Sequence, residues 1–365
     1  MVWPRRDLTD LLGVEHPLIQ APMASATTPA LAVAVARSGG VGSLGCARLA
    51  PDAVVEQTAQ VRRATDRPLN LNFFTNPPAR VDPARDMAAR ELLAPFYAEL
   101  DLAEPPPARD MSVHFDEDML ETVLSLKPEI VSFHFGLPEI EMLDAIRGIG
   151  SVVLSSATTV REALLLEERG ADAIIAQGWE AGGHRGTFAS PFPHAQVGTF
   201  ALVPQVVDAV SVPVIAAGAI ADGRGIAAAF ALGASGVQIG TAFLRCPEAA
   251  IPNAYREALA EAGADGTEVT KAFTGRPARS LRNRYVEHMA EQVGRDGEGL
   301  PEFPLMMALH GPLRAASAER DLPDFIPLWS GQAAALGTDL PAEDLVRRLV
   351  AEAGAAFERL GPTHS

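Results

Sequence analysis

The chain has 365 residues, 48 % hydrophobic and 21 % charged, which is the composition of a globular protein with a large core. Its formal net charge of -16 repels phosphate backbones and anionic lipids, so neither nucleic acid nor a membrane is expected as a partner. The two cysteines, Cys46 and Cys246, form no CxxC motif, which argues against a zinc ribbon or a disulfide scaffold and fits a reducing cytoplasm. No apolar run follows the arginines near the N-terminus, so a signal peptide is not expected.

Short runs rich in β-branched residues alternate with helical stretches over the first two thirds of the chain. Strands are predicted at 17–20, 41–44, 69–74, 129–133, 151–155, 173–177, 213–217 and 236–240. Helices are predicted near 29–38, 51–65, 138–148, 158–169, 199–209 and 223–232. Apolar strands separated by helices predict a parallel sheet covered by helices, which makes this an α/β fold. Eight such units favour closure into a (βα)₈ TIM barrel, with a doubly wound open sheet as the alternative.

Two regions do not fit the βα repeat. The interval 75–128, with its run Pro105–Pro107, is interpreted as a surface excursion. Residues 246–335 are interpreted as a mostly helical cap inserted after strand eight, before a closing amphipathic helix at 341–360. We therefore predict a TIM barrel formed by 1–245 and 336–365, and a helical cap or substrate domain formed by 246–335.

Polar residues and glycines gather at the predicted carboxyl ends of the strands, where TIM barrels place their active sites. They are Gln20 to Met23 after strand one, Asn70 and Asn72 on strand three, His134 after strand four, Gln177, Gly182, Gly183 and His184 after strand six, Gly218 after strand seven, and Gly240 and Thr241 after strand eight. We expect this rim to be the functional site.

The residues after strands seven and eight suggest a phosphate site. Gly218 and the pair Gly240–Thr241 offer backbone N–H groups without an obstructing side chain, at a place where barrels often bind phosphate. Taken singly, each glycine could equally be an ordinary turn residue. The chain has no GxGxxG after its first strand, so a Rossmann dinucleotide site is not indicated.

Amide side chains at the rim suit a flavin. Asn72, Gln177 and Gln238 both donate and accept hydrogen bonds, as the pyrimidine edge and ribityl chain of a flavin require. Their alternative is a hydrogen-bonded amide inside the barrel core. Met23 follows Pro22, so its backbone could approach a flat ring, although a core-filling methionine explains it as well.

Two histidines are the candidate chemical groups. His184 follows Gly182 and Gly183, and its imidazole could accept a proton from a carbon acid or stabilise an anion; a surface-loop histidine is the alternative. His134 lies between two aromatic residues at a strand end, where it could also be a satisfied core histidine. No HExxH motif and no grouped carboxylate accompany them, so no metal site is predicted.

Other conspicuous residues are interpreted as structural. The basic residues Lys271, Arg276, Arg279, Arg282 and Arg284 could lie over a phosphate, but we interpret them as a solvated face of the cap. Cys246 and Trp329 are interpreted as packing residues.

With these motifs together, the chain resembles the nitronate monooxygenase family, formerly called 2-nitropropane dioxygenases, over nearly its whole length. The resemblance is carried by Gln20–Met23, Asn70–Phe74, Ser132–Gly136, Gln177–Gly186, Ala217–Gly218, Gln238–Thr241 and Trp329–Gln332. The Gly-Gly-His loop alone is less specific, because flavin-dependent enoyl-acyl-carrier-protein reductases have a similar one.

The resemblance implies a TIM barrel with a helical cap, one non-covalent FMN, and oxidative denitrification of alkyl nitronates such as propionate 3-nitronate with O₂, releasing nitrite and a carbonyl product. It implies FMN contacts from Met23, Asn72, Gln177, Gly182, Gly183, Gly218, Gln238, Ile239, Gly240 and Thr241. His184 would be the catalytic histidine beside the flavin, and His134 would act in the substrate pocket. The two histidines would give the anionic nitronate a local positive field.

The cap departs from the family pattern. Relatives tend to place tyrosines there, whereas residues 302–310 contain none, and Phe and Met cannot donate phenolic hydrogen bonds to a nitro group. A flavin reductase that uses NADH or NADPH to reduce a quinone or enoyl thioester is therefore the alternative function. A non-catalytic phosphate-ligand binder is a third hypothesis. Small molecules and O₂ are the expected partners, and the protein is expected to be a monomer or homodimer.

Overall fold

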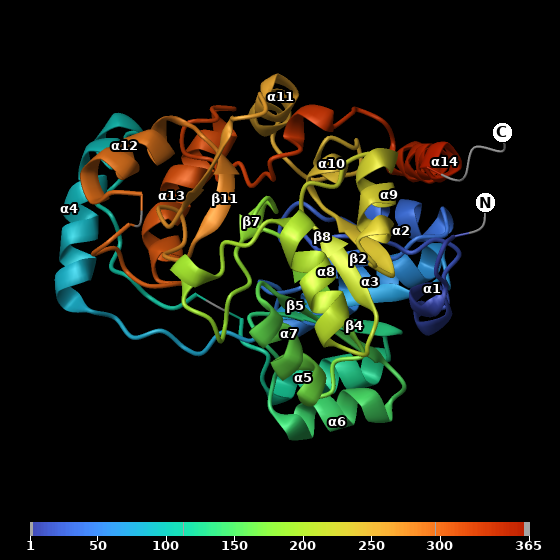
Figure 1. Ribbon diagram of the computed structural model, residues 1–365. Coiled ribbons are helices and arrows are strands. Elements are labelled where there is room, and N and C mark those ends of the chain that lie inside the picture. Colours follow the sequence, from blue (N-terminus) through green and yellow to red (C-terminus); the bar gives the residue numbers. More distant parts are fainter. Residues whose placement is uncertain (1–2, 112, 296, 361–365) are drawn as a thin grey trace.

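The computed structural model describes residues 3–111, 113–295 and 297–360, and its centre is a parallel barrel (Figure 1). The barrel strands are β1 (Leu18–Gln20), β2 (Gly42–Gly45), β3 (Leu69–Phe74), β4 (Ile130–His134), β5 (Val152–Ala157), β6 (Ala173–Gln177), β8 (Val214–Ala217) and β9 (Gly236–Ile239). They are ordered β1-β9-β8-β6-β5-β4-β3-β2, and a parallel bridge between Ile19 and Val41 joins the two end strands. The predicted TIM barrel is thus confirmed, and the open doubly wound sheet is excluded.

Helices cover the outside of the barrel. They are α2 (Pro29–Arg37), α3 (Pro51–Ala64), α5 (Glu117–Leu126), α6 (Ile140–Gly148), α7 (Val160–Glu168), α8 (Thr199–Ala209), α9 (Gly223–Ala231) and α14 (Ala342–Leu360). Side-chain caps fix several of their starts: the Thr28 hydroxyl accepts from Leu31 N, and the Asp222 carboxylate accepts from Arg224 N and Gly225 N. The closing helix α14 packs on α9 and α2, as the predicted position at the end of the chain requires.

The amino-terminal end of the barrel is plugged by α1 (Asp7–Leu12). Its Leu8 and Leu12 are buried in one cluster with Ile19, Ile130 and Ile215 from the barrel strands. Because that end is filled with apolar side chains, polar chemistry is left to the carboxyl ends of the strands.

The region after β9 is mostly helical but also contains a small sheet. Its elements are α10 (Thr241–Leu244), α11 (Asn253–Glu261), β10 (Thr267–Thr270), β11 (Ala278–Leu281), α12 (Arg284–Val293), α13 (Met306–Glu319) and η2 (Ala334–Leu336). Strand β11 pairs antiparallel with β10 and also with β7 (Gly183–His184), which lies in the loop that contains η1 (Phe192–His194). This three-stranded sheet, which the sequence did not predict, ties the Gly-Gly-His loop to the cap.

The interval interpreted as a surface excursion holds a 17-residue helix, α4 (Pro83–Glu99). Figure 1 shows α4 beside α12 and α13, away from the barrel. Leu93 and Tyr97 of α4 are buried in one cluster with Tyr285 and Leu309, and the Tyr97 hydroxyl donates to the Leu309 carbonyl. The excursion interpretation was wrong for α4, because its apolar face packs on the cap. The division at 246–335 stays a prediction, and α4 adds to the cap from outside it.

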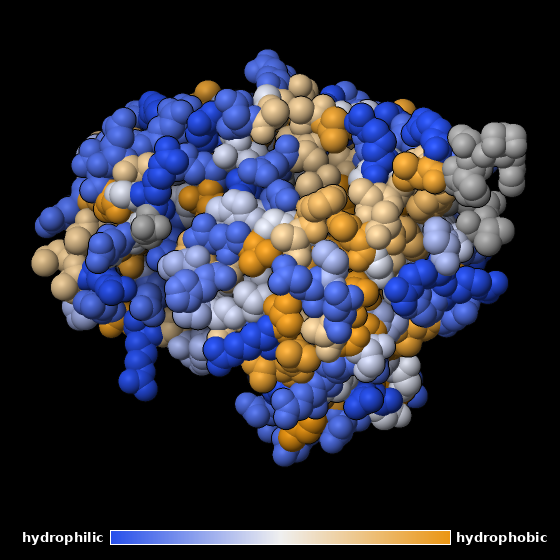
Figure 2. Space-filling view, in the orientation of Figure 1, coloured by the Kyte–Doolittle hydropathy of each residue, from blue (hydrophilic) through white to orange (hydrophobic). Residues whose placement is uncertain are grey.

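The outer surface differs between the two parts of the molecule. Figure 2 shows hydrophilic residues over the lobe that contains α4, α12 and α13, and a greater share of apolar residues over the barrel helices. Among the residues that the structure describes, no helix is both long and apolar enough to span a lipid bilayer.

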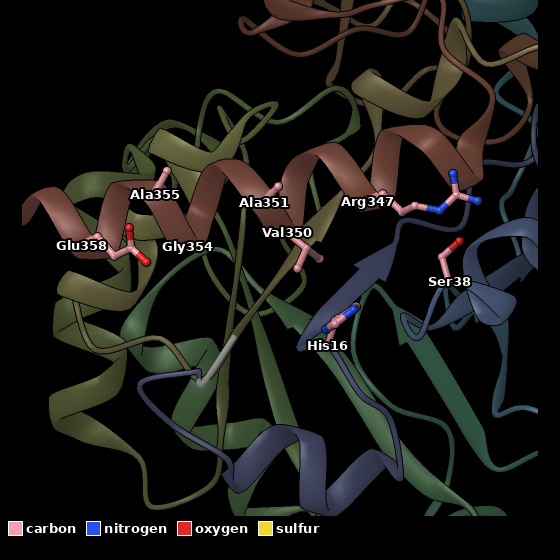
Figure 3. Close-up of a pocket in the computed structure, with 8 residues that line it drawn as sticks. All are labelled: His16, Ser38, Arg347, Val350, Ala351, Gly354, Ala355 and Glu358. Atoms are coloured by element: carbon pink, nitrogen blue, oxygen red, sulfur yellow. The ribbon is translucent and has the colours of Figure 1, made fainter.

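One cavity of about 500 Å³ lies against α14, far from the strands' carboxyl ends (Figure 3). It is lined by His16, Ser38, Arg347, Val350, Ala351, Gly354, Ala355 and Glu358. His16 precedes β1 and Ser38 precedes β2, so this cavity belongs to the amino-terminal side of the barrel and not to the predicted active site.

Candidate active site

Two histidines meet at the carboxyl ends of the strands. His134 ends β4, with its Nδ1 2.5 Å from Ser156 Oγ and its Nε2 3.2 Å from the carbonyl oxygen of His184. A carbonyl oxygen only accepts, so Nε2 of His134 carries the hydrogen and Nδ1 accepts from the Ser156 hydroxyl. His184 lies in β7, with Nε2 3.0 Å from Thr274 Oγ1 of the cap. The structure thus brings together the two histidines that the sequence singled out.

Both imidazoles are neutral. Burial lowers the pKa of His134 and of His184 to about 3, and the second cause for each is the positive charge of Arg276. At neutral pH, therefore, neither ring carries a charge. The prediction that the two histidines supply a positive field was wrong, because burial and the charge of Arg276 both favour the neutral ring.

The cation beside them is Arg276, which the sequence placed on a solvated face. Its guanidinium carbon lies 3.7 Å from the centre of the Phe135 ring, and its Nη2 donates to the carbonyl oxygen of Thr187. Burial lowers the pKa of Arg276 to about 10, so the group stays charged at neutral pH. The interpretation as a solvated residue was wrong, because the antiparallel pairing of β11 with β7 brings this segment over the barrel end.

An aromatic wall surrounds His184. The ring centres of Phe74, Phe135, Phe303 and Trp329 lie 6.1, 6.0, 5.2 and 5.5 Å from that of His184. Trp329 packs against the hydrophobic cluster of the cap, as interpreted from the sequence, and its ring also lies beside the candidate catalytic histidine. The signal that could have identified it is its place in the Trp329–Gln332 motif.

The Gly-Gly-His loop is held in place by Gln177 at the end of β6. Its Nε2 donates to the His184 carbonyl at 3.0 Å, and its Oε1 accepts from Gly186 N at 2.8 Å. Gly186 also lies against His134, since a Cβ there would be 2.7 Å from Cε1 of that ring. Gln177 therefore acts on the site by fixing the loop that carries His184.

A buried carboxylate fixes the continuation of this loop. Glu162 is 0 % exposed, and its Oε1 accepts from the backbone N–H groups of Phe188, Ala189 and Ser190 at 3.0, 3.2 and 3.0 Å. Its Oε2 accepts from the backbone and hydroxyl of Thr158. Because its oxygens are engaged in this way, Glu162 is a structural residue and not a free base.

Several glycines named as cofactor contacts occupy backbone positions that only glycine fits. Gly218 has φ of 114°, and a Cβ there would lie 2.8 Å from Thr199 Oγ1. A Cβ at Gly182 would lie 2.5 Å from Gly331 N, whereas Gly183, with φ of 72°, has open space above it. The packing of the protein itself thus requires glycine at 182 and 218, and of these three glycines only Gly183 leaves open space beside its backbone.

The remaining predicted contacts lie around the ends of β1 and β9. A Cβ at Gly240 would be 3.7 Å from Met23 Sδ, and Thr241 Oγ1 accepts from Gly331 N at 2.9 Å. Ile239 is 1 % exposed and packs in the core, and its carbonyl oxygen accepts from Ala21 N at 2.7 Å. Gln238 Oε1 is buried and has no hydrogen-bond partner among the described residues, which leaves an acceptor for a bound molecule.

Asn72 is already engaged within the barrel. Its Nδ2 donates to the carbonyl and hydroxyl oxygens of Ser132 at 3.2 and 3.0 Å.

In residues 3–111, 113–295 and 297–360, no group of three or more His, Cys, Asp or Glu side chains is placed to hold a metal ion.

A closed parallel barrel with two enclosed histidines, a charged arginine and an aromatic wall at its catalytic end defines a TIM-barrel enzyme. The family model described as nitronate monooxygenase matches residues 5–352. The chain belongs to the nitronate monooxygenase family and is an oxidoreductase, as its motifs indicated.

Individual relatives agree with this assignment. The nitronate monooxygenase of Pseudomonas aeruginosa is 44 % identical over 346 residues, covering 94 % of this chain and 98 % of that protein. That of Paraburkholderia phytofirmans is 42 % identical over 362 residues, covering 98 % of this chain and 97 % of that protein.

Two solved structures share the whole architecture. A nitroalkane oxidase from Streptomyces ansochromogenes superimposes with a TM-score of 0.88 and 36 % identity, covering 97 % of this chain and 100 % of the other. FabK from Thermotoga maritima gives a TM-score of 0.75 and 30 % identity, covering 98 % of this chain and 99 % of the other.

Proposed function

We propose that the protein is an FMN-dependent nitronate monooxygenase that oxidises alkyl nitronates such as propionate 3-nitronate with O₂, releasing nitrite and a carbonyl product. The observation that carries this proposal is the neutral histidine pair beside Arg276 and the aromatic wall, in a chain of the nitronate monooxygenase family. A small anion with an apolar carbon skeleton suits a site that offers a cationic guanidinium and several aromatic rings.

The residues around the barrel end fit FMN. We assign its binding to Met23, Asn72, Gln177, Gly182, Gly183, Gly218 and the segment Gln238–Thr241. The orphaned Gln238 Oε1 and the side-chain-free backbone at Gly183 and Gly218 support the assignment, since a flavin needs polar partners for its ring edge and backbone N–H groups for its phosphate. Asn72 and Gln177 already hydrogen-bond within the protein, so their assignment rests on the family resemblance. When bound, FMN supplies the one-electron and oxygen chemistry.

His184 is assigned the role of catalytic residue. The Thr274 hydroxyl donates to the Arg276 carbonyl at 3.4 Å, so it accepts from Nε2–H of His184. The lone pair of the neutral ring is then on Nδ1, where it can accept the acidic proton from the carbon of a neutral nitroalkane and so generate the nitronate. His134 is held by Ser156 and by the His184 carbonyl, and it completes the pocket from β4.

An anaerobic experiment tests the proposal. The purified holoenzyme is mixed separately with a nitronate and with NADH or NADPH, and the flavin absorbance is followed. Reduction by the nitronate, with nitrite appearing once O₂ is admitted, supports the monooxygenase. Reduction by the nicotinamide alone contradicts it.

The second candidate is the NADH- or NADPH-dependent reductase of a quinone or enoyl thioester. The likeness to FabK and the absence of tyrosine from residues 302–310 favour it. In the same experiment, reduction of the flavin by NADH or NADPH is the result that distinguishes this function. A protein that is colourless and stays so after FMN is added would instead favour the non-catalytic binder.

A further inference from the structure

The positive charge at the barrel end is carried by an arginine whose hydrogen-bonding capacity is largely unused. Among the described residues, the side chain of Arg276 makes one hydrogen bond, from Nη2 to the Thr187 carbonyl. Its Nε is buried and has no partner, and the one carboxylate among the described residues that acts on the guanidinium, Glu162, does so through its charge without a hydrogen bond. A guanidinium has five N–H donors, so most of those of Arg276 remain available.

Two neighbouring arginines differ from Arg276, because each of their three guanidinium nitrogens donates a hydrogen bond. Arg279 donates to the Trp179 carbonyl and to Thr267 Oγ1, and stacks at 4.9 Å over the Trp179 ring. Arg185 donates to the carbonyl oxygens of Ala195 and Gly178. These two side chains hold loops together, whereas Arg276 keeps its donors free.

The carboxylate that acts on Arg276 most strongly is occupied elsewhere. Glu162 raises the pKa of Arg276 against the larger effect of burial, but its oxygens accept from the 188–190 backbone and from Thr158. A buried cation without a counter-ion is unfavourable, and it becomes favourable once an anion binds to it.

The free donors are placed beside the reacting groups. The guanidinium stacks 3.7 Å from the Phe135 ring centre and lies 5.9 Å from that of Phe303, and both rings are neighbours of His184. An anion bound there would contact the aromatic wall and lie beside the imidazole.

We infer that Arg276 binds the negative charge of the substrate, taking the two coplanar oxygens of a nitronate group in the fork of its guanidinium. This inference rests on the proposed function and deepens it. A planar guanidinium matches a planar O–N–O anion in geometry, which an ammonium or an imidazole does not. The substrate carbon is then directed toward His184, and the apolar remainder of the substrate toward Phe74, Phe303 and Trp329.

The test compares Arg276→Gln and Arg276→Lys with the wild-type holoenzyme, and Arg282→Gln serves as the control because Arg282 is exposed in the same segment. Inorganic nitrate, a planar oxyanion that is not a substrate, is titrated against the flavin absorbance spectrum, and neutral nitroethane is the uncharged probe. Flavin content and melting temperature show whether each variant is folded.

We expect Arg276→Gln to raise the nitrate dissociation constant about tenfold or more, because a charge-assisted hydrogen bond is worth about 1.5–3 kcal/mol and 1.4 kcal/mol is a factor of ten. Arg276→Lys keeps the positive charge but lacks the two parallel N–H donors of the guanidinium, so it should raise the nitrate dissociation constant by a smaller factor. The affinity for nitroethane should be the same in the Arg276 variants as in the wild type. Arg282→Gln should bind nitrate with the wild-type dissociation constant. The KM for the nitronate should rise in parallel with the nitrate constant.

Unchanged nitrate affinity in both folded Arg276 variants would overturn the inference. If Arg276→Gln does not fold, the Arg276→Lys comparison decides it alone. If the Arg276 variants lose nitrate binding but the wild-type enzyme oxidises no nitronate, the proposed function is wrong and the anion site remains. Nitronate oxidation with unchanged anion affinity in the variants would keep the function and remove the role of Arg276.

Discussion

His184 is the residue at which the proposed chemistry can be separated from cofactor binding. Its ring is fixed by Thr274 and surrounded by aromatic side chains, so its removal takes away a proton acceptor and not a phosphate contact. We expect His184→Ala to retain FMN and to lose about 100-fold or more in kcat, the usual contribution of a general acid or base. Nitrite release from a neutral nitroalkane, whose carbon carries the acidic proton, measures turnover, and absorbance measures FMN content. The exposed His194 provides the control, since His194→Ala should turn over normally. Normal turnover in His184→Ala would remove it from the mechanism.

Gly218 tests the phosphate end of the proposed FMN site. Its positive φ and the contact of an added Cβ with Thr199 Oγ1 mean that Gly218→Val must shift the loop after β8. We expect the FMN dissociation constant to rise about tenfold or more, since a shift of this kind removes at least one charge-assisted hydrogen bond. Gly150→Val is the matched control, because Gly150 also has a positive φ of 87° but lies between α6 and β5 with open space around it. Equal FMN affinity in the two variants would exclude Gly218 from the site.

At the scale of the element, the short strand β7 connects the barrel to the cap through its pairing with β11. Gly182, which precedes it, has the Ser330–Gly331 backbone within 2.5–2.6 Å of where a Cβ would lie. We expect Gly182→Ala to displace the Trp329–Gly331 segment and reduce kcat about tenfold or more, since small misplacements of catalytic groups are costly. Gly294→Ala, which follows α12 at a positive φ of 70° and meets open space, should cost only the backbone strain of about 1 kcal/mol. A smaller effect of Gly182→Ala on kcat than of Gly294→Ala would contradict this account of the loop.

Helix α4 shows what local patterns missed at the same scale. Its buried residues Ala89, Leu93, Phe96 and Tyr97 follow the spacing of one helical face, a signal present in the sequence. The nearby run Pro105–Pro107 instead favoured a surface excursion. The spacing indicates the helix, but no local pattern specifies that it packs on the distant α13.

Over the whole molecule, the barrel was predictable because each βα unit repeats the same apolar pattern, and the rim residues follow from where the strands end. The eight predicted strands all exist, with bounds that differ by two residues or fewer. The environment of Arg276 was not predictable in this way. It depends on the pairing of residues 278–279 with 183–184, and a basic segment taken alone is typical of a solvated surface. The neutral state of the histidines has the same origin, since their pKa values are set by burial and by Arg276.

The enclosed histidines also make the stability of the whole molecule depend on pH. His310 of α13 is 3 % exposed, its Nε2 lies 2.9 Å from the Phe325 carbonyl oxygen, and burial lowers its pKa from 6.5 to about 3. Between these two values the unfolded chain binds a proton that the folded chain does not. The free energy of unfolding therefore falls as the pH is lowered from about 6.5 toward 3, and above 6.5 this group contributes no pH dependence.

His310→Gln isolates this contribution, because the glutamine amide can keep the donor to Phe325 while removing the titration. Urea unfolding with saturating FMN is compared at pH 7.5 and pH 5.5. Between the two pH values, we expect the free energy of unfolding of the variant to fall by roughly 1 kcal/mol less than that of the wild type. Each pH unit below 6.5 lowers this free energy by about 1.4 kcal/mol per buried neutral histidine. His194→Gln, at an exposed position, should follow the wild-type curve. If His310→Gln follows it too, His310 is protonated in the folded protein, and burial does not control its charge.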